Sequence, residues 1–370
     1  MALREPKETS APENRSLLAP IAQLAKRKET FRRSLAVVLV NALANIRTFP
    51  EICRLIRTKP FFDALRGNPR FILRCLTRDY LVRGLSVGVS ARCFLYHHRR
   101  LHLTLSPELV RKLTLDEATL YEASDEVARV SVTLGQTVPP HDKEGELDIS
   151  LQVDGKPVSL LSFTVVPGWV AGSEAPEVLL ISRMQGILGC YPEIKMARKV
   201  LADVAPNALL LAALQGIALG LGIDQVASVS SAQQSVYRED IAERLHRAYE
   251  EFFGELGIEK NDAGFLVTSV PLAEKPMSAI KAGHKLRTKE KREVKLAVKT
   301  SSFEFIRAHL VKHQVGGVTL IRQRSAPRGP APLRKKPAPV PSPQAQPYAQ
   351  GVATAIEATE RTFPAPAIND

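Results

Sequence analysis

The residues from 147 to 270 constrain the fold more than any other part of the sequence, because they form an ordered series of strand and helix patterns. Apolar and polar residues alternate over 147–153, which is the pattern of a strand with one buried face. Asp154-Gly155 follows, and this pair is typical of a two-residue β-hairpin turn. A returning strand is predicted over 157–166, so the two strands should form an antiparallel hairpin.

A third predicted strand, over 178–182, is apolar up to its last residue and leads into Arg183-Met184-Gln185-Gly186. Further along, the patterns predict helices over 193–204, 206–222 and 240–256, and strands over 226–229 and 264–270. Strands joined by short turns are antiparallel, whereas strands reached through helices can run parallel to their neighbours. The predicted fold class is therefore α/β, a mixed sheet with helices on both faces, preceded by a helical N-terminal region.

Four regions are expected along the chain. Residues 1–15 are expected to be disordered, and 16–100 to form a basic helical N-terminal region, because apolar residues recur there at helical spacing. The α/β core is expected over 101–315. Residues 316–370 are expected to be a Pro/Ala-rich disordered tail, since ten of the 26 prolines fall within 325–370.

Charge is distributed unevenly along the sequence. Residues 1–100 hold 20 Lys and Arg against 7 Asp and Glu, 101–270 hold 13 against 24, and 271–370 hold 18 against 7. The basic flanks can contact phosphate groups of an anionic membrane or nucleic acid, or they can face the acidic middle of the chain and solvent. Nucleic acid is not expected, because the basic run over 281–299 lacks interleaved aromatic residues for stacking on bases.

A few sequence features indicate the cellular compartment of the protein and whether it binds a metal. The N-terminus lacks the apolar core of a secretory signal. The uncharged run 204–223 contains Pro206 and Gln215, so it is interpreted as a buried helix and not as a transmembrane span. The four cysteines form no CxxC pair and the histidines no metal-spaced set, so free thiols and no metal are expected. The predicted location is cytoplasmic, with peripheral contact to the inner membrane as an alternative.

Five sequence blocks carry a family resemblance. They read LLISRMQG (179–186), NALLLAALQGIALGLG (207–222), VSSAQQSVY (229–237), YEEFFGELG (249–257) and GFLVTSVP (264–271). In this order and approximate spacing they resemble the VirK/YbjX family of bacterial proteins (DUF535). The resemblance implies a Gram-negative protein linked to virulence and envelope properties, with no defined reaction. It also makes an envelope-biogenesis protein an expected partner, beside an anionic membrane surface.

The predicted order of strands and helices is similar to that of N-acetyltransferase folds. In those folds, a turn of the form Arg/Gln-x-x-Gly-x-Gly/Ala and the following helix N-terminus hold the pyrophosphate of an acyl-coenzyme A. Here Arg183, Gln185 and Gly186 match the first half, and Gly189 comes one residue late because Leu188 occupies the position of the next small residue. These four residues are the candidate sites for an acyl-CoA cofactor. The alternative is that the glycines only turn the chain out of the sheet.

Ser230 and Tyr237 are the candidate catalytic residues, because acyl transfer needs groups that exchange protons and both follow the strand over 226–229. Tyr249 lies among apolar residues at helical spacing and is expected in the core. Two functions stay open. One is an acyltransferase-like enzyme acting on an envelope-related acceptor. The other is a non-enzymatic factor that binds an anionic membrane or an envelope-biogenesis partner through its basic flanks.

Overall fold

The computed structural model of the chain describes residues 40–42, 45, 48–67, 74–139 and 141–311. The expected disordered segment 1–15 and the Pro/Ala-rich tail 316–370 lie outside these residues, as does the first part of the N-terminal helical region. Among the described helices, none combines the length and the apolar character needed to cross a membrane.

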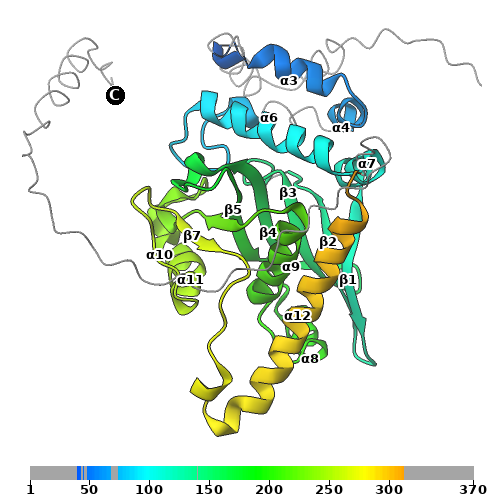
Figure 1. Cartoon of the computed structure of the whole chain (residues 1–370), viewed down its shortest axis with the longest axis vertical. Helices are drawn as coiled ribbons and strands as arrows, with labels where there is room; N and C mark the ends of the chain where they lie inside the picture. Colours follow the sequence, from blue (N-terminus) through cyan, green and yellow to red (C-terminus); the bar gives the residue numbers. More distant parts are fainter. Residues whose placement is uncertain (1–39, 43–44, 46–47, 68–73, 140, 312–370) are drawn as a thin grey trace, which may run out of the picture. The chain divides into compact units, whose positions relative to one another are not determined.

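A single seven-stranded sheet forms the centre of the described structure (Figure 1). Its strands follow one another in chain order: β1 (Glu117–Ser124), β2 (Arg129–Gln136), β3 (Leu147–Val153), β4 (Lys156–Pro167), β5 (Glu177–Gly186), β6 (Gln225–Ser228) and β7 (Leu266–Ser269). Neighbouring strands are antiparallel except β5 and β6, which are parallel. The predicted mixed sheet is therefore confirmed.

The β3–β4 hairpin forms where the sequence predicts it. Asp154 and Gly155 both have positive φ, 50° and 79°, and Val153 pairs with Lys156 across the turn. A two-residue turn with two positive φ values matches the twist of the flanking strands. This register sets Asp148 opposite Ser162, and Ser162 opposite Arg183 on β5, so a row of polar residues crosses three strands.

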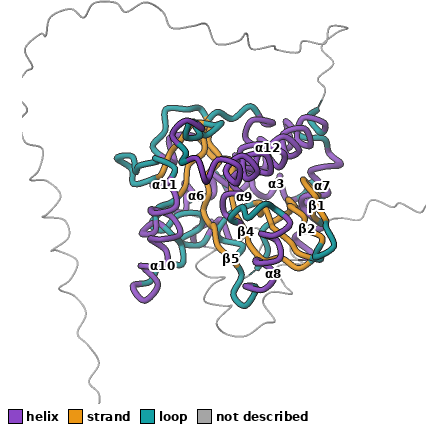
Figure 2. The backbone as a smooth tube through the Cα atoms, turned by 90° about the horizontal axis from the view of Figure 1, so that it is seen from below, coloured by secondary structure: helices purple, strands orange, loops and turns teal. Residues whose placement is uncertain are grey.

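Helices cover the sheet and its ends. They are α3 (Phe49–Ile56), α4 (Phe61–Gly67), α6 (Val87–Thr104), α7 (Pro107–Leu115), α8 (Tyr191–Val200), α9 (Pro206–Leu221), α10 (Ala242–His246), α11 (Phe252–Glu255) and α12 (Lys285–Ala308). Helix α9 packs on β3, β4 and β5, and α12 packs on α9 and β1. Figure 2 shows α9 and α12 side by side along the sheet.

Helix α9 contains most of the uncharged run, and its interpretation as a buried helix is confirmed. Pro206 occupies its first turn, where no backbone donor is needed, and Gly222 ends it with a φ of 76°. Its residues are buried on nearly all sides because it lies between the sheet and α12. Gly216 and Gly220 face α12, where the two backbones come close together.

The C-terminal helix α12 begins at Lys285, within the basic run over 281–299, where the sequence pattern predicts no helix. Its first half has few apolar residues, so apolar periodicity does not reveal it. Ion pairs support it instead, including Lys289 with Glu293 one turn apart and Lys291 with Asp203.

Candidate functional site

The residues predicted to hold a coenzyme pyrophosphate lie at the end of β5, and they do not all face the same way. The Arg183 side chain is only 2% exposed, and its Nη1 donates to Glu144 Oε2 at 3.3 Å. Gln185 and Gly186 are exposed, and Gly189 has a φ of 82°. Three of the four predicted residues therefore border the surface turn, while the Arg183 guanidinium is enclosed beside Glu144.

The turn after β5 is an exposed apolar projection. Leu188 is 98% exposed, and Tyr191, the first residue of α8, is 77% exposed. Gly189 contributes the left-handed backbone that brings the chain into α8. Exposed side chains of this size at the tip of a turn are available for contact with another surface.

The edge of β5 beyond its partner β6 is closed by side chains. Strand β6 pairs with β5 only from Leu179 to Ile181, so the two strands separate after that point. Met184 N then donates to Tyr249 Oη at 3.0 Å, and Gln234 Nε2 donates to Ser182 O. Tyr249 is buried as expected, and burial raises the pKa of its phenol to about 12.

Ser230 and Tyr237 lie on one loop after β6 but have different surroundings. Ser230 is buried, and its backbone N–H donates to Gln233 Oε1 at 3.1 Å. Tyr237 is half-buried, with the guanidinium carbon of Arg83 4.9 Å from its ring centre. The loop thus places both residues near the end of β6, and their catalytic roles stay predictions.

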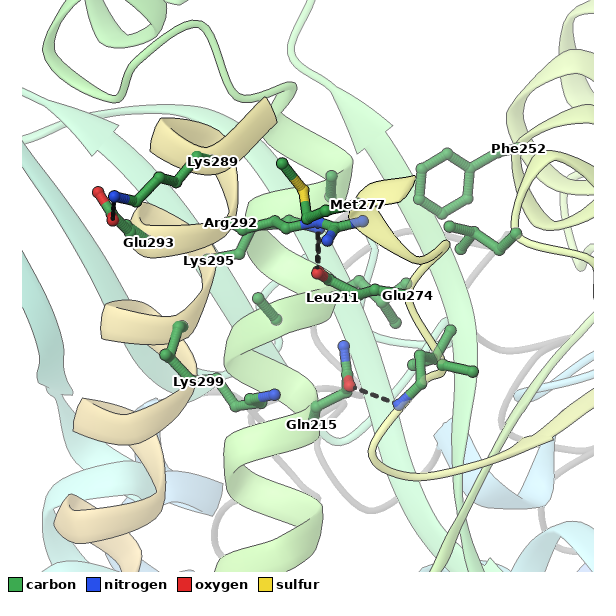
Figure 3. Close-up of a pocket in the computed structure, with 16 residues that line it drawn as sticks. Leu211, Gln215, Phe252, Glu274, Met277, Lys289, Arg292, Glu293, Lys295 and Lys299 are labelled. Carbon is green, nitrogen blue, oxygen red and sulfur yellow. Dashed lines mark hydrogen bonds and ion pairs between the residues drawn. The ribbon is translucent and has the colours of Figure 1, made fainter. Parts of the chain in front are cut away.

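A groove of about 470 Å³ lies between α9, α12, α11 and the segment that follows β7 (Figure 3). Its size falls within the range of small-molecule pockets, roughly 300–1,000 Å³. The apolar part of its lining comprises Ala208, Leu211, Ala212, Phe252, Leu256, Leu272, Ala273, Met277 and Leu296. The polar part comprises Gln215, Glu274, Lys289, Arg292, Glu293, Lys295 and Lys299.

Glu274 joins the two sides of this groove. Its Oε2 lies 2.8 Å from Arg292 Nε and its Oε1 lies 2.6 Å from Lys295 Nζ (Figure 3). Gln215 Oε1 accepts from Leu272 N at 2.9 Å, which holds the start of the same segment against α9. The segment from 272 to 277 is therefore fastened to both helices.

Lys299 is the groove cation that lacks an acidic partner within the described residues. Its side chain is half-buried and extends from α12 toward Gln215 (Figure 3). Lys289, by contrast, lies 3.8 Å from Glu293. A partly desolvated ammonium without a counter-charge attracts an anion.

We call the turn 186–191, α8 and the start of α12 the basic end of the molecule. Figure 1 shows α8 and the start of α12 toward the same end. Asp203 connects these parts through ion pairs with Arg198, Arg287 and Lys291. The hydrogen bonds from Arg287 and Lys291 lower the pKa of Asp203 to about 2. Leu286 is 71% exposed beside these cations.

A buried ionic cluster connects the N-terminal helices to the sheet. Glu146 pairs with Arg74 at 2.5 Å and with His98 Nε2 at 2.8 Å, and it accepts from Tyr80 Oη. Burial alone raises the pKa of Glu146, but Arg74 and His98 together lower it to about 2. The sequence does not reveal this cluster, because its members are far apart in the chain and form no spacing motif.

Of the four cysteines, Cys75, Cys93 and Cys190 are buried and Cys53 is half-buried. Within the described part of the chain, no group of three or more His, Cys, Asp or Glu side chains is arranged to hold a metal ion.

One comparison with known proteins gave a match. The model of a family described as a protein of unknown function (DUF535) matches residues 27–293, which is well over half of the chain. Neither the curated proteins nor the solved structures gave a match. The matched span extends from before the first described helix into α12, so it includes the whole seven-stranded sheet. The chain belongs to the DUF535 family.

Proposed function

We propose that this protein binds the surface of an anionic membrane through its basic end. The observation that carries the proposal is the exposed turn: Leu188 and Tyr191 project beside a helix whose Lys195 and Lys199 are exposed. Apolar side chains that enter the interface between headgroups and acyl chains, with cations around them, are the usual elements of peripheral membrane binding.

The start of α12 adds to the same surface. Residues 271–311 contain ten Lys and Arg against four Glu, and most of this excess lies in the first half of α12. Each cation near an anionic leaflet contributes about 1 kcal/mol, and burying a leucine contributes roughly 1.5–3 kcal/mol. A few of these contacts together are enough for reversible attachment. In the context of the VirK/YbjX resemblance, the membrane would be part of a Gram-negative envelope.

Vesicle sedimentation tests the proposal. The full chain is expected to sediment with vesicles that contain phosphatidylglycerol and to stay in solution with phosphatidylcholine vesicles. Leu188→Asp should reduce sedimentation severalfold, because it places a charge at the inserted tip. Leu103→Asp is the matched control, since Leu103 is 71% exposed on α6, toward the other end of the molecule (Figure 1). Equal sedimentation with both kinds of vesicle would rule the proposal out.

An acyltransferase-like enzyme that uses acyl-CoA is the second candidate. It is favoured by the parallel pair of β5 and β6, which separate after Ile181 and are joined through the turn at Gly186 and Gly189. Membrane binding is favoured over it because Arg183 is enclosed and because Gln234 and Tyr249 occupy the separated strand edge. In this function Gln185 and the two glycines would contact the pyrophosphate, and Ser230 and Tyr237 would exchange protons.

Calorimetric titration with acetyl-CoA and longer acyl-CoA thioesters tests this second candidate. Binding that Gln185→Ala weakens, together with transfer that Ser230→Ala or Tyr237→Phe slows, would support it. A folded sample that gives no binding heat with any thioester would eliminate it.

A further inference from the structure

We propose that the groove between α9 and α12 binds a single-chain fatty carboxylate, with the carboxylate on Lys299 and the hydrocarbon chain along the apolar wall. This site is separate from the exposed tip of the basic end, and the inference does not depend on membrane binding. It rests on three features of the groove: its apolar wall, its one cation without a counter-charge among the described residues, and its length.

The apolar wall is suited to a hydrocarbon chain. Leu211 of α9, Leu256 of the segment ending α11 and Met277 of the segment after β7 approach from three sides. Methionine adapts its shape to flexible apolar ligands, which suits a chain without fixed conformation. Lys289 and Lys299 lie ten residues apart on α12, so the groove follows the helix for about 15 Å.

The carboxylate end is defined by two donors. Lys299 extends toward Gln215, and the amide nitrogen of Gln215 is directed into the groove while its oxygen accepts from Leu272 N (Figure 3). Gln215 is 9% exposed, so its orientation is fixed by its surroundings. An ammonium and an amide N–H at one end of an apolar groove can satisfy both oxygens of a carboxylate.

Each of the other groove cations lies within 4 Å of a carboxylate. Arg292 and Lys295 share Glu274, and Lys289 pairs with Glu293. The groove lining holds four cations against two carboxylates, and among the described residues Lys299 is the cation without an acidic partner, so a ligand carboxylate would pair with Lys299. A chain ending in a single carboxylate matches this better than a ligand with several phosphates.

Calorimetry with dodecanoate below its critical micelle concentration tests the site in the full chain. Dodecanoate should bind at least about tenfold more tightly than dodecanol, because a charge-assisted hydrogen bond to Lys299 is lost with the alcohol. Shortening the chain to decanoate should weaken binding roughly four- to fifteenfold, because two methylenes leave the apolar wall. Absence of dodecanoate binding, or equal affinity for the acid and the alcohol, would overturn the inference.

Two matched variants locate the carboxylate. Lys299→Met keeps the length of the side chain but removes the charge, and it should weaken dodecanoate binding about tenfold or more. Lys285→Met removes an exposed charge of the same helix outside the groove and should leave the affinity unchanged. If both variants weaken dodecanoate binding equally, the fatty acid is attracted by the overall positive charge of α12, and the proposed site at Lys299 is wrong.

Vesicle sedimentation separates this inference from membrane binding. Lys299→Met should sediment with phosphatidylglycerol vesicles as the unmodified chain does, while Leu188→Asp should keep its affinity for dodecanoate. Vesicle binding without dodecanoate binding would overturn the groove site and leave membrane binding standing. Dodecanoate binding without vesicle binding would overturn the membrane-binding proposal and leave the groove site standing.

Discussion

A Cβ atom at Gly216 would lie 2.2 Å from the carbonyl oxygen of Lys299. No real side chain tolerates that separation, so the absence of a side chain at Gly216 is what allows α9 and α12 to pack backbone to backbone. The same contact fixes the place of Lys299 at the end of the groove.

Gly216→Ala should therefore destabilise the protein by about 1–3 kcal/mol, because α12 must move outward to make room. Gly254→Ala is the control, since Gly254 lies in α11 and nothing lies within 4 Å of the position that its new methyl group would take. Urea unfolding measures both. A Gly216→Ala protein as stable as the control would show that the helices are not in this contact.

The buried His97 should make stability depend on pH. Its Nδ1 accepts from Val165 N at 3.0 Å, so the folded protein holds the ring neutral, and burial lowers its pKa to about 3. The unfolded chain binds a proton near pH 6.5, so stability is complete above that value and falls as the pH drops toward 3. The slope should approach about 1.4 kcal/mol per pH unit for this one group.

His97→Asn should flatten the pH dependence of the unfolding free energy between about pH 6 and pH 4, measured by urea denaturation. Glu146 adds a second pH dependence of the unfolding free energy at lower pH. Because its pKa is lowered in the folded protein, its contribution to stability is present above about pH 4.5 and is lost toward pH 2. An unchanged slope over the upper range in the His97→Asn protein would contradict the assignment.

The enclosed pair of Arg183 and Glu144 should be needed for folding more than for ligand contact. Arg183→Met removes the buried cation beside Glu144 and leaves His141 as the ionic partner of that carboxylate, and it should cost about 3–5 kcal/mol. The double variant with Glu144→Gln should recover much of that loss, because the side chain that paired with Arg183 is then uncharged. Thermal unfolding of the two single variants and the double variant gives a double-mutant cycle. Purely additive losses of stability would argue against the pairing of Arg183 with Glu144.

Asp203 should limit how strongly the basic end attracts an anionic surface. It neutralises part of the charge of Arg198, Arg287 and Lys291, so Asp203→Asn raises the positive charge of that end by one. Attachment to phosphatidylglycerol vesicles should increase about fivefold at low salt, because one added charge contributes about 1 kcal/mol. The gain should disappear at high ionic strength, where exposed charges are screened. A gain that persists in high salt would point to a conformational effect.

Local patterns predict strands β3 to β7 because each is a short run of apolar or alternating residues bounded by turn residues or helices. The Asp154-Gly155 hairpin, the buried helix ending at Gly222 and the core position of Tyr249 all follow from residues that are neighbours in sequence. These features need no knowledge of distant parts of the chain. The mixed α/β fold could therefore be predicted from the sequence.

Features that depend on distant residues could not be predicted. The local sequence places Arg183 beside a glycine turn, where an arginine would be expected at the surface. Its pairing with Glu144 becomes visible only in the folded structure. The groove likewise forms from α9, α11, α12 and the segment after β7, and half of α12 lacks the apolar periodicity that identifies a helix. The candidate ligand residues Gln215 and Lys299 have meaning only once those helices are packed together.

The glycine contact between α9 and α12 also determines which side of the groove can adjust. Gly216 and Gly220 leave no gap for α12 to shift inward, since a methyl group at Gly220 would already meet Ile306 at 2.7 Å. The opposite side is the segment from 272 to 277. Its described polar contacts with the helices are those of Gln215 with Leu272, of Glu274 with Arg292 and Lys295, and of Arg292 with the Lys275 carbonyl. Ligands of different thickness would therefore be accommodated by displacement of that segment, with the helix pair acting as the stationary wall.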